Sequence, residues 1–423
     1  MMVIRDGRFK SKALSLCLIL GVLATGCDES KEASVEEHLK RAQELLKTAD
    51  FRGSVVELKN VLQADPNNAD ARLILSQVYA ETGDGESAEK EILRARELGM
   101  KGAEVMKALG RAYILTRKFK QILEDFTVEA SEPASRQAAI FLLRGDAYYG
   151  LGKNIEAETA FDKAIEAYRK DINEERPHLK LTELPEFVAA IVGKTLVSIR
   201  RRNWTEANKR LSFAFEVSPE NPEVLAAKGE ITFKQEEPAA SEKAYAAAFE
   251  AKPYNLEYQV GIARAQIALK KFDEAITNLD AVRKHFPNHI ISNQYRALAA
   301  LQSGDNETAK QFADAVLKIA PEYYLAHLIA GAANYGLGNY EQANSFLSRY
   351  IGRAPNDHHA RKLLGLTQLR LRRASAALAT LQPLSENLPD DPQILNLIAT
   401  AAVGVGDLTT ATAYYQKALI ENP

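Results

Sequence analysis

The feature that most constrains this chain is a proline that recurs every 34 residues through its second half. A small residue lies twelve positions before every one of these prolines, and another lies twenty-four positions before all but the first. A period of this length is typical of a supersecondary unit that is repeated and stacked into an array. The prolines are Pro219, Pro253, Pro287, Pro321, Pro355, Pro389 and Pro423.

The residues between the prolines predict a pair of antiparallel helices per period. Paired helices need small side chains where their backbones approach and large ones where a gap remains. The small positions are Gly229, Ala263, Ala297, Gly331, Gly365 and Ala399 in first helices, and Ala207, Ser241, Ala275, Ala309, Ala343, Ala377 and Ala411 in second helices. Large apolar residues follow the second set by four positions, at Leu211, Tyr245, Leu279, Leu347, Leu381 and Tyr415, with Ala313 as the exception. Each proline ends a second helix, and glycines at 83, 152, 304, 338 and 406 predict left-handed turns within the pairs.

The same motif can be traced upstream with a slip in register. We expect a first sub-array of about four repeats over residues 34–170, an inserted loop over 171–185, and a second sub-array of seven repeats over 186–423. The chain of 423 residues would therefore be an all-α, right-handed superhelical solenoid of antiparallel helix pairs, with about eleven repeats.

The N-terminus has the order of a lipoprotein signal peptide. Four basic residues precede the apolar stretch ALSLCLILGVLA, and small residues lead into Cys27. We predict a signal peptide over residues 1–26, lipidation of Cys27, and a tether over 27–33. The alternative is an ordinary signal peptide with an incidental cysteine. The predicted location is the periplasmic side of the inner membrane, which Asp28 weakly favours, with the outer membrane left open.

Candidate catalytic and metal-binding residues are few. His285 and His289 are four residues apart, but Pro287 between them keeps them off a common helical face. The net charge of −2 gives no basic surface for nucleic acid. We therefore predict a protein that is not an enzyme and that has no cofactor, metal, nucleic acid or small-molecule substrate.

The array itself predicts a binding surface, because first helices line the concave face of such solenoids. One line of this groove comprises Phe233, Ile267, Leu301, Tyr335, Leu369 and Val403, and the polar candidates beside it are Arg264, Lys362 and Asn396. The alternative is that this line is partly buried against the neighbouring repeat. An apolar groove would suit an extended peptide or a helix of an envelope protein. We also expect the helix over 408–421 to leave Tyr414 and Leu419 uncovered.

Residues 27–423 resemble the tetratricopeptide repeat family. The stretch from Glu57 to Gly99, ELKNVLQADPNNADARLILSQVYAETGDGESAEKEILRARELG, is similar to the N-terminal part of the repeat lipoproteins of the exosortase/PEP-CTERM sorting system. That resemblance implies a scaffold for exopolysaccharide export and protein sorting. The alternatives are a scaffold of another envelope machine, for cellulose secretion or pilus assembly, and the repeat portion of a longer enzyme such as a glycosyltransferase.

Overall fold

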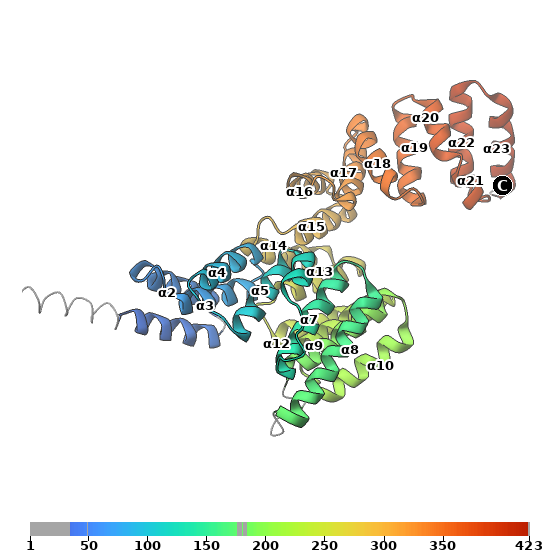
Figure 1. The fold of residues 1–423 in the computed structure, drawn as a ribbon. Helices are drawn as coiled ribbons and strands as arrows, with labels where there is room; N and C mark the ends of the chain where they lie inside the picture. The colour runs from blue at the N-terminus through green and yellow to red at the C-terminus, as the bar shows by residue number, and fades with distance from the viewer. Residues whose placement is uncertain (1–33, 49, 176–179, 181–183, 422–423) are drawn as a thin grey trace, which may run out of the picture. The chain divides into compact units, whose positions relative to one another are not determined.

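The computed structural model describes residues 34–421 except 49, 176–179 and 181–183. The predicted signal peptide, Cys27 and the tether lie outside these residues. Every regular element in the described part of the chain is a helix, and the helices follow one another as antiparallel pairs (Figure 1). The prediction of an all-α solenoid of helix pairs is confirmed.

Four pairs precede the predicted insertion. They are residues 34–47 with α2 (Phe51–Ala64), α3 (Ala69–Glu81) with α4 (Gly85–Glu97), α5 (Ala103–Leu115) with α6 (Phe119–Asp125), and α7 (Ala134–Gly150) with α8 (Asn154–Lys170). Seven pairs follow it. They are α9 (Pro185–Arg200) with α10 (Trp204–Val217), α11 (Pro222–Lys234) with α12 (Pro238–Ala251), α13 (Leu256–Ala268) with α14 (Phe272–His285), α15 (Ile290–Ser303) with α16 (Asn306–Ile319), α17 (Tyr324–Gly336) with α18 (Tyr340–Arg353), α19 (His358–Arg370) with α20 (Ala374–Leu381) and α21 (Leu384–Asn387), and α22 (Pro392–Val405) with α23 (Leu408–Glu421). The expected eleven repeats are therefore present.

The second helices end at a constant distance from the prolines that recur every 34 residues. Helices α10, α12, α14, α16 and α18 each stop two residues before a proline, which cannot donate the next helical hydrogen bond. The predicted glycines at 83, 152, 304, 338 and 406 all have a positive φ. Repeats that lack this glycine use the same left-handed backbone with another residue: Arg117, Arg202, Glu236, Lys270 or Arg372.

The small and large repeat positions pack as predicted. A Cβ added to Gly331 of α17 would lie 2.7 Å from Leu347 of α18, and both residues are buried. In α8, the ring of Phe161 fills the space left by Gly145 of its own pair and Gly193 of the next. Where the period has Ala313 instead of a large residue, the neighbouring Phe312 is 9% exposed. Large side chains thus fill the space both within a pair and between pairs.

The chain divides into two compact units, and the division does not fall at the predicted insertion. The first unit contains residues up to Ile231 together with Ala247–Leu256, and the second contains Thr232–Ala246 and the residues from Glu257 onward. One core cluster runs from Ala138 of α7 through Phe187 of α9 to Ile231 of α11. The insertion therefore interrupts the period without interrupting the core. Its described beginning, Asp171–Glu175, is a π-helical turn that extends α8, and much of the rest lies outside the described residues.

Contacts within the first unit join repeats that are far apart in the sequence. The ring of Tyr254, just after α12, meets that of Phe51 edge to face at 4.6 Å. Beside it, Lys252 Nζ lies 2.9 Å from Glu81 Oε2 of α3. The residues after α12 therefore pack directly on the first two repeats.

Candidate protein-binding surface

Most residues of the predicted apolar line pack between neighbouring repeats and do not line an open groove. Ile267 is 4% exposed in the core between α13 and α15, so its assignment to an open groove is wrong. Leu301 and Leu369 are half-buried and pack against the cores that follow them in the array. Val403 of α22 is 48% exposed. The physical reason is that Ile267, Leu301 and Leu369 pack against residues of the next helix pair, whereas no described pair follows the pair of α22 and α23.

Two aromatic members of the line are also engaged by neighbours. The guanidinium carbon of Arg264 lies 4.1 Å from the ring centroid of Phe233, and Arg264 donates a hydrogen bond of 3.2 Å to the hydroxyl of Tyr245. The ring of Tyr335 meets that of Tyr340 at 5.6 Å, and a hydrogen bond to Tyr335 raises the pKa of Arg370. Arg264 is thus a contact between repeats rather than a groove cation.

The polar candidates near the C-terminal end are more accessible. Asn396 of α22 is exposed, and Lys362 of α19 is half-buried and donates to Gln393 Oε1 at 2.5 Å. On the last described helix, Leu419 is 66% exposed as expected. The expectation for Tyr414 is wrong, because its ring packs on the core formed by α20 and α22. The structure therefore leaves Asn396 and Val403 exposed on α22, with the half-buried Lys362 on the preceding first helix, α19.

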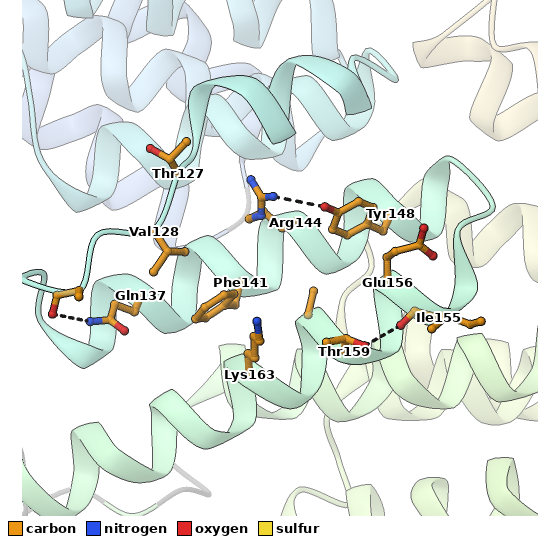
Figure 2. Close-up of a pocket in the computed structure, with 12 residues that line it drawn as sticks. Thr127, Val128, Gln137, Phe141, Arg144, Tyr148, Ile155, Glu156, Thr159 and Lys163 are labelled. Atoms are coloured by element: carbon orange, nitrogen blue, oxygen red, sulfur yellow. Dashed lines mark hydrogen bonds between the residues drawn. The ribbon is translucent and has the colours of Figure 1, made fainter.

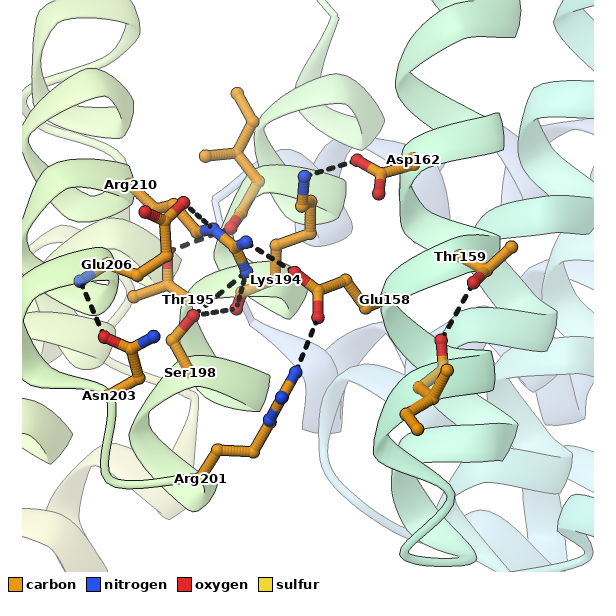
Figure 3. Close-up of polar contacts among 12 residues, drawn as sticks. Glu158, Thr159, Asp162, Lys194, Thr195, Ser198, Arg201, Asn203, Glu206 and Arg210 are labelled. Atoms are coloured by element: carbon orange, nitrogen blue, oxygen red, sulfur yellow. Dashed lines mark hydrogen bonds and ion pairs between the residues drawn. The ribbon is translucent and has the colours of Figure 1, made fainter.

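A polar cluster joins α8, α9 and α10, and it is structural (Figure 3). Arg210 donates to Glu158 Oε1 at 2.5 Å and to Glu206 Oε1 at 2.8 Å, while Arg201 reaches the other oxygen of Glu158 at 3.1 Å. Burial raises the pKa of Glu158, but the hydrogen bond and charge of Arg210 outweigh burial and lower it. Glu158 lies in α8, Arg201 directly follows α9, and Glu206 and Arg210 lie in α10. The cluster therefore ties the fourth pair to the fifth.

A second charged group lies in the first unit, and the sequence did not predict it. It comprises Glu81, Arg111 and Asp146 on first helices and Lys252 just after α12. Glu81 Oε2 forms an ion pair with Lys252 Nζ at 2.9 Å, and Glu81 Oε1 lies 3.6 Å from Arg111 of α5. Burial raises the pKa of Asp146 in α7 to about 7, and the charge of Arg111 opposes that shift. No sequence signal could have found this group, because Lys252 and Arg111 are brought together only by the fold.

His289 has a structural role at the start of a helix. His289 begins α15 as its N-cap, where Nδ1 accepts from the backbone N–H of Ser292 at 3.3 Å. Within residues 34–421, apart from the gaps given above, no group of three or more His, Cys, Asp or Glu side chains could hold a metal ion. Over the same residues, no helix is both long and apolar enough to cross a membrane.

Comparison with known proteins gives one consistent family. The tetratricopeptide repeat model that matches most of the chain covers residues 36–112, 232–301, 300–366 and 335–401, which is more than half of its length. Two further tetratricopeptide repeat models match residues 198–255 and 138–171. No curated protein matches.

Several solved structures are similar to this chain at low identity. The Cut9–Hcn1 hetero-tetramer of the APC/C is similar over 92% of this chain and 94% of that one, with 12% identity and a TM-score of 0.42. PilF of Pseudomonas aeruginosa is similar over 49% and 94%, with 17% identity and a TM-score of 0.44. PilW, a type IV pilus biogenesis factor, is similar over 49% and 96%, with 16% identity and a TM-score of 0.45. From the family matches and the packed helix pairs, this chain belongs to the tetratricopeptide repeat family.

Proposed function

We propose that this protein is a lipid-anchored, non-enzymatic scaffold on the periplasmic side of the inner membrane, where it assembles envelope proteins for exopolysaccharide export and PEP-CTERM sorting. Tetratricopeptide repeat proteins bind partner proteins, and the packed array provides such a scaffold. The observation that carries the anchoring part is the sequence order at the N-terminus, in which basic residues, an apolar stretch and Cys27 precede the first helix at residue 34.

The spacing between Cys27 and the array sets the reach of the scaffold. A chain extends by at most about 3.5 Å per residue, so the tether over residues 27–33 would span about 25 Å. An acyl group on Cys27 would therefore hold the first repeats beside the membrane surface. The accessible residues Lys362, Asn396 and Val403 lie at the other end of the sequence, on first helices of the last repeats. We propose that envelope partners bind there.

The anchor is tested by metabolic labelling with palmitate in cells that express the full chain. Wild type and the matched control Cys17→Ser are expected to incorporate label, because Cys17 lies in the segment that would be removed. Cys27→Ser is expected to incorporate none and to accumulate as an unprocessed precursor. Equal labelling of Cys27→Ser would contradict the anchor.

The pathway is tested in a strain that lacks this gene. Loss of surface polysaccharide together with unprocessed PEP-CTERM proteins is expected, with rescue by wild type and weaker rescue by Cys27→Ser. Normal polysaccharide and sorting, combined with a defect in pili or in cellulose secretion, would contradict the proposed pathway and favour another envelope machine.

A further inference from the structure

The third helix pair has a shortened second helix, and a cavity lies where that helix stops. The preceding second helix, α4, has 13 residues, whereas α6 has 7. Elsewhere in the array, second helices pack on the first helix of the next pair, as α4 does on α5 and α8 on α9. The shortening of α6 leaves part of α7 without this cover. The missing length is about 9 Å of helix, or nearly two turns.

The cavity has a volume of about 650 Å³ and lies between the α6–α7 link, α7 and α8 (Figure 2). Phe141 and Tyr148 line it from α7, Val128 lines it from the link, and Ile155 and Lys163 line it from α8. Ile155 is 73% exposed and lines the cavity together with the apolar side chains of Val128 and Phe141.

The rim of this cavity is held in place by hydrogen bonds. Arg144 donates to the carbonyl oxygens of Leu123 at 2.9 Å and Phe126 at 3.0 Å, which are orphan acceptors at the end of α6. Gln137 donates to the carbonyl oxygen of Glu132 at 2.7 Å. The link between α6 and α7 is therefore tied to α7, and the cavity is a formed feature of the fold.

The charges that line the cavity favour an anionic partner. Arg144 and Lys163 both line it, and among the described residues neither forms an ion pair with a carboxylate. The ammonium of Lys163 lies 5.6 Å from the ring centroid of Phe141. Glu156 is the one acidic residue in the lining, so the lining has a net positive charge. A carboxylate that entered the cavity would lie near the cations of Arg144 and Lys163 and the ring of Phe141.

We propose that this cavity binds a short helical segment of a partner protein that carries apolar side chains and at least one carboxylate. Such a segment would take the place of the missing turns of α6, with its apolar side chains on Phe141, Val128 and Ile155 and its carboxylate beside Lys163. The site is lined by the α6–α7 link, α7 and α8, it includes none of Lys362, Asn396 and Val403, and it does not depend on the lipid anchor or on the pathway proposed above.

The test uses a set of fluorescent peptides of about twelve residues, which span about 18 Å as helices. Each peptide has two leucines four residues apart and one glutamate, which is moved through the remaining positions in turn. Binding to the full chain is measured by fluorescence anisotropy. We expect at least one peptide to bind, and its glutamine analogue to bind about fivefold more weakly.

Three variants locate the site. Lys163→Glu reverses one charge without touching the backbone hydrogen bonds of the rim, and it is expected to weaken binding about tenfold. Thr159→Trp is expected to place an indole ring in the cavity, which would block the proposed segment sterically and abolish binding. Lys209→Glu makes the same charge change on the exposed surface of α10 and is the matched control, with binding unchanged. A peptide with lysine in place of glutamate is expected to bind Lys163→Glu more tightly than wild type.

Several outcomes would overturn the proposal. They are the absence of binding by every peptide, equal binding to wild type and Thr159→Trp, and equal weakening by Lys163→Glu and Lys209→Glu. Decanoate provides a further control, because it supplies a carboxylate and an apolar chain without a peptide. If decanoate binds the cavity as tightly as the best peptide, the cavity is a small-molecule site and the proposed protein partner is wrong. Thermal melts of each variant exclude loss of folding as the cause.

Discussion

The repeats after α13 and the repeats before the insertion use the same packing rules but differ in regularity. From α13 onward, the first helices begin every 34 residues, at Leu256, Ile290, Tyr324, His358 and Pro392. Upstream, α6 has 7 residues, while α7 and α8 have 17 each. The regular repeats use their recurring positions for packing. The irregular repeats contain a cavity and the carboxyl group of Asp146 with its raised pKa, so we expect specific binding at the departures from the period.

The largest expected effect contrasts a core leucine of the regular region with an exposed isoleucine of the irregular one. Leu347 is 0% exposed against Gly331, and Leu347→Ala is expected to cost about 2 to 5 kcal/mol in the free energy of unfolding. Ile155→Ala is expected to change it by less than about 0.5 kcal/mol. Urea denaturation followed by circular dichroism measures both. Similar losses in the two variants would show that Ile155 is part of the core.

A second contrast compares Leu369 and Val403, which occupy the same repeat position but are covered to different extents by neighbouring helices. Leu369 packs between repeats, whereas Val403 at the equivalent position is 48% exposed. Leu369→Glu would bury a charge and is expected to cost about 2 kcal/mol or more. Val403→Glu is expected to cost less than about 0.5 kcal/mol. Equal stability of the two variants in urea would mean that Leu369 is accessible and that the groove is open along this line.

The pH dependence of stability provides a third contrast. Burial raises the pKa of Asp146 from its ordinary value of 3.8 to about 7. The folded state therefore favours the protonated form, and the contribution of this group to stability falls as the pH rises through about 7. Asp146→Asn remains neutral and is expected to be more stable than wild type by about 1 to 3 kcal/mol at pH 8, with no gain near pH 4. Urea denaturation at the two pH values measures the difference.

Asp357 in the regular region is the control, because its pKa is lowered whereas that of Asp146 is raised. Burial opposes its ionisation, but hydrogen bonds from the Ala360 N–H and the Tyr350 hydroxyl lower the pKa of Asp357. Its contribution is therefore present at neutral pH and is lost as the pH falls below about 4. Asp357→Ala is expected to cost about 1 kcal/mol at pH 7, as for other N-caps. A stability gain for Asp146→Asn that did not vary with pH would contradict the raised pKa.

Much of this architecture could be predicted from the sequence because the period fixes backbone geometry. The prolines, the small positions and the five turn glycines each report a local steric requirement, and the structure meets these requirements at the positions it describes, which exclude Pro423. The groove could not be predicted with the same accuracy. The spacing that places Ile267 on a first helix does not say whether the next repeat covers it, since cover depends on the side chains of that repeat.

The cavity and the charged group of the first unit could not be predicted at all. At the early end of α6, the carbonyl groups of Leu123 and Phe126 accept from Arg144 of α7, which lies 21 residues after Leu123 in the sequence. The raised pKa of Asp146 depends on burial by neighbouring repeats. Both are tertiary effects without a periodic signal.

The smallest expected effect concerns the turns within helix pairs. Lys270 adopts a φ of 60°, whereas Gly304 at the equivalent turn of the next pair has a φ of 90°. A left-handed backbone is unfavourable for residues with a Cβ, so Lys270→Gly is expected to stabilise by about 0.5 kcal/mol, and Gly304→Ala to destabilise by about 1 kcal/mol. Thermal melts of the two variants measure the difference. Destabilisation by Lys270→Gly would show that its side chain contributes more than its backbone costs.

The most direct test of the account is photo-crosslinking in living cells at two matched positions. Ile155 and Glu307 are each the second residue of a second helix, the first beside the cavity of the irregular region and the other on the regular array. With benzoylphenylalanine at position 155, we predict capture of a partner protein through a segment with apolar and acidic residues, and loss of that capture in the Lys163→Glu background. At position 307 we predict no capture. Equal capture at both positions, or none at position 155, would contradict the account.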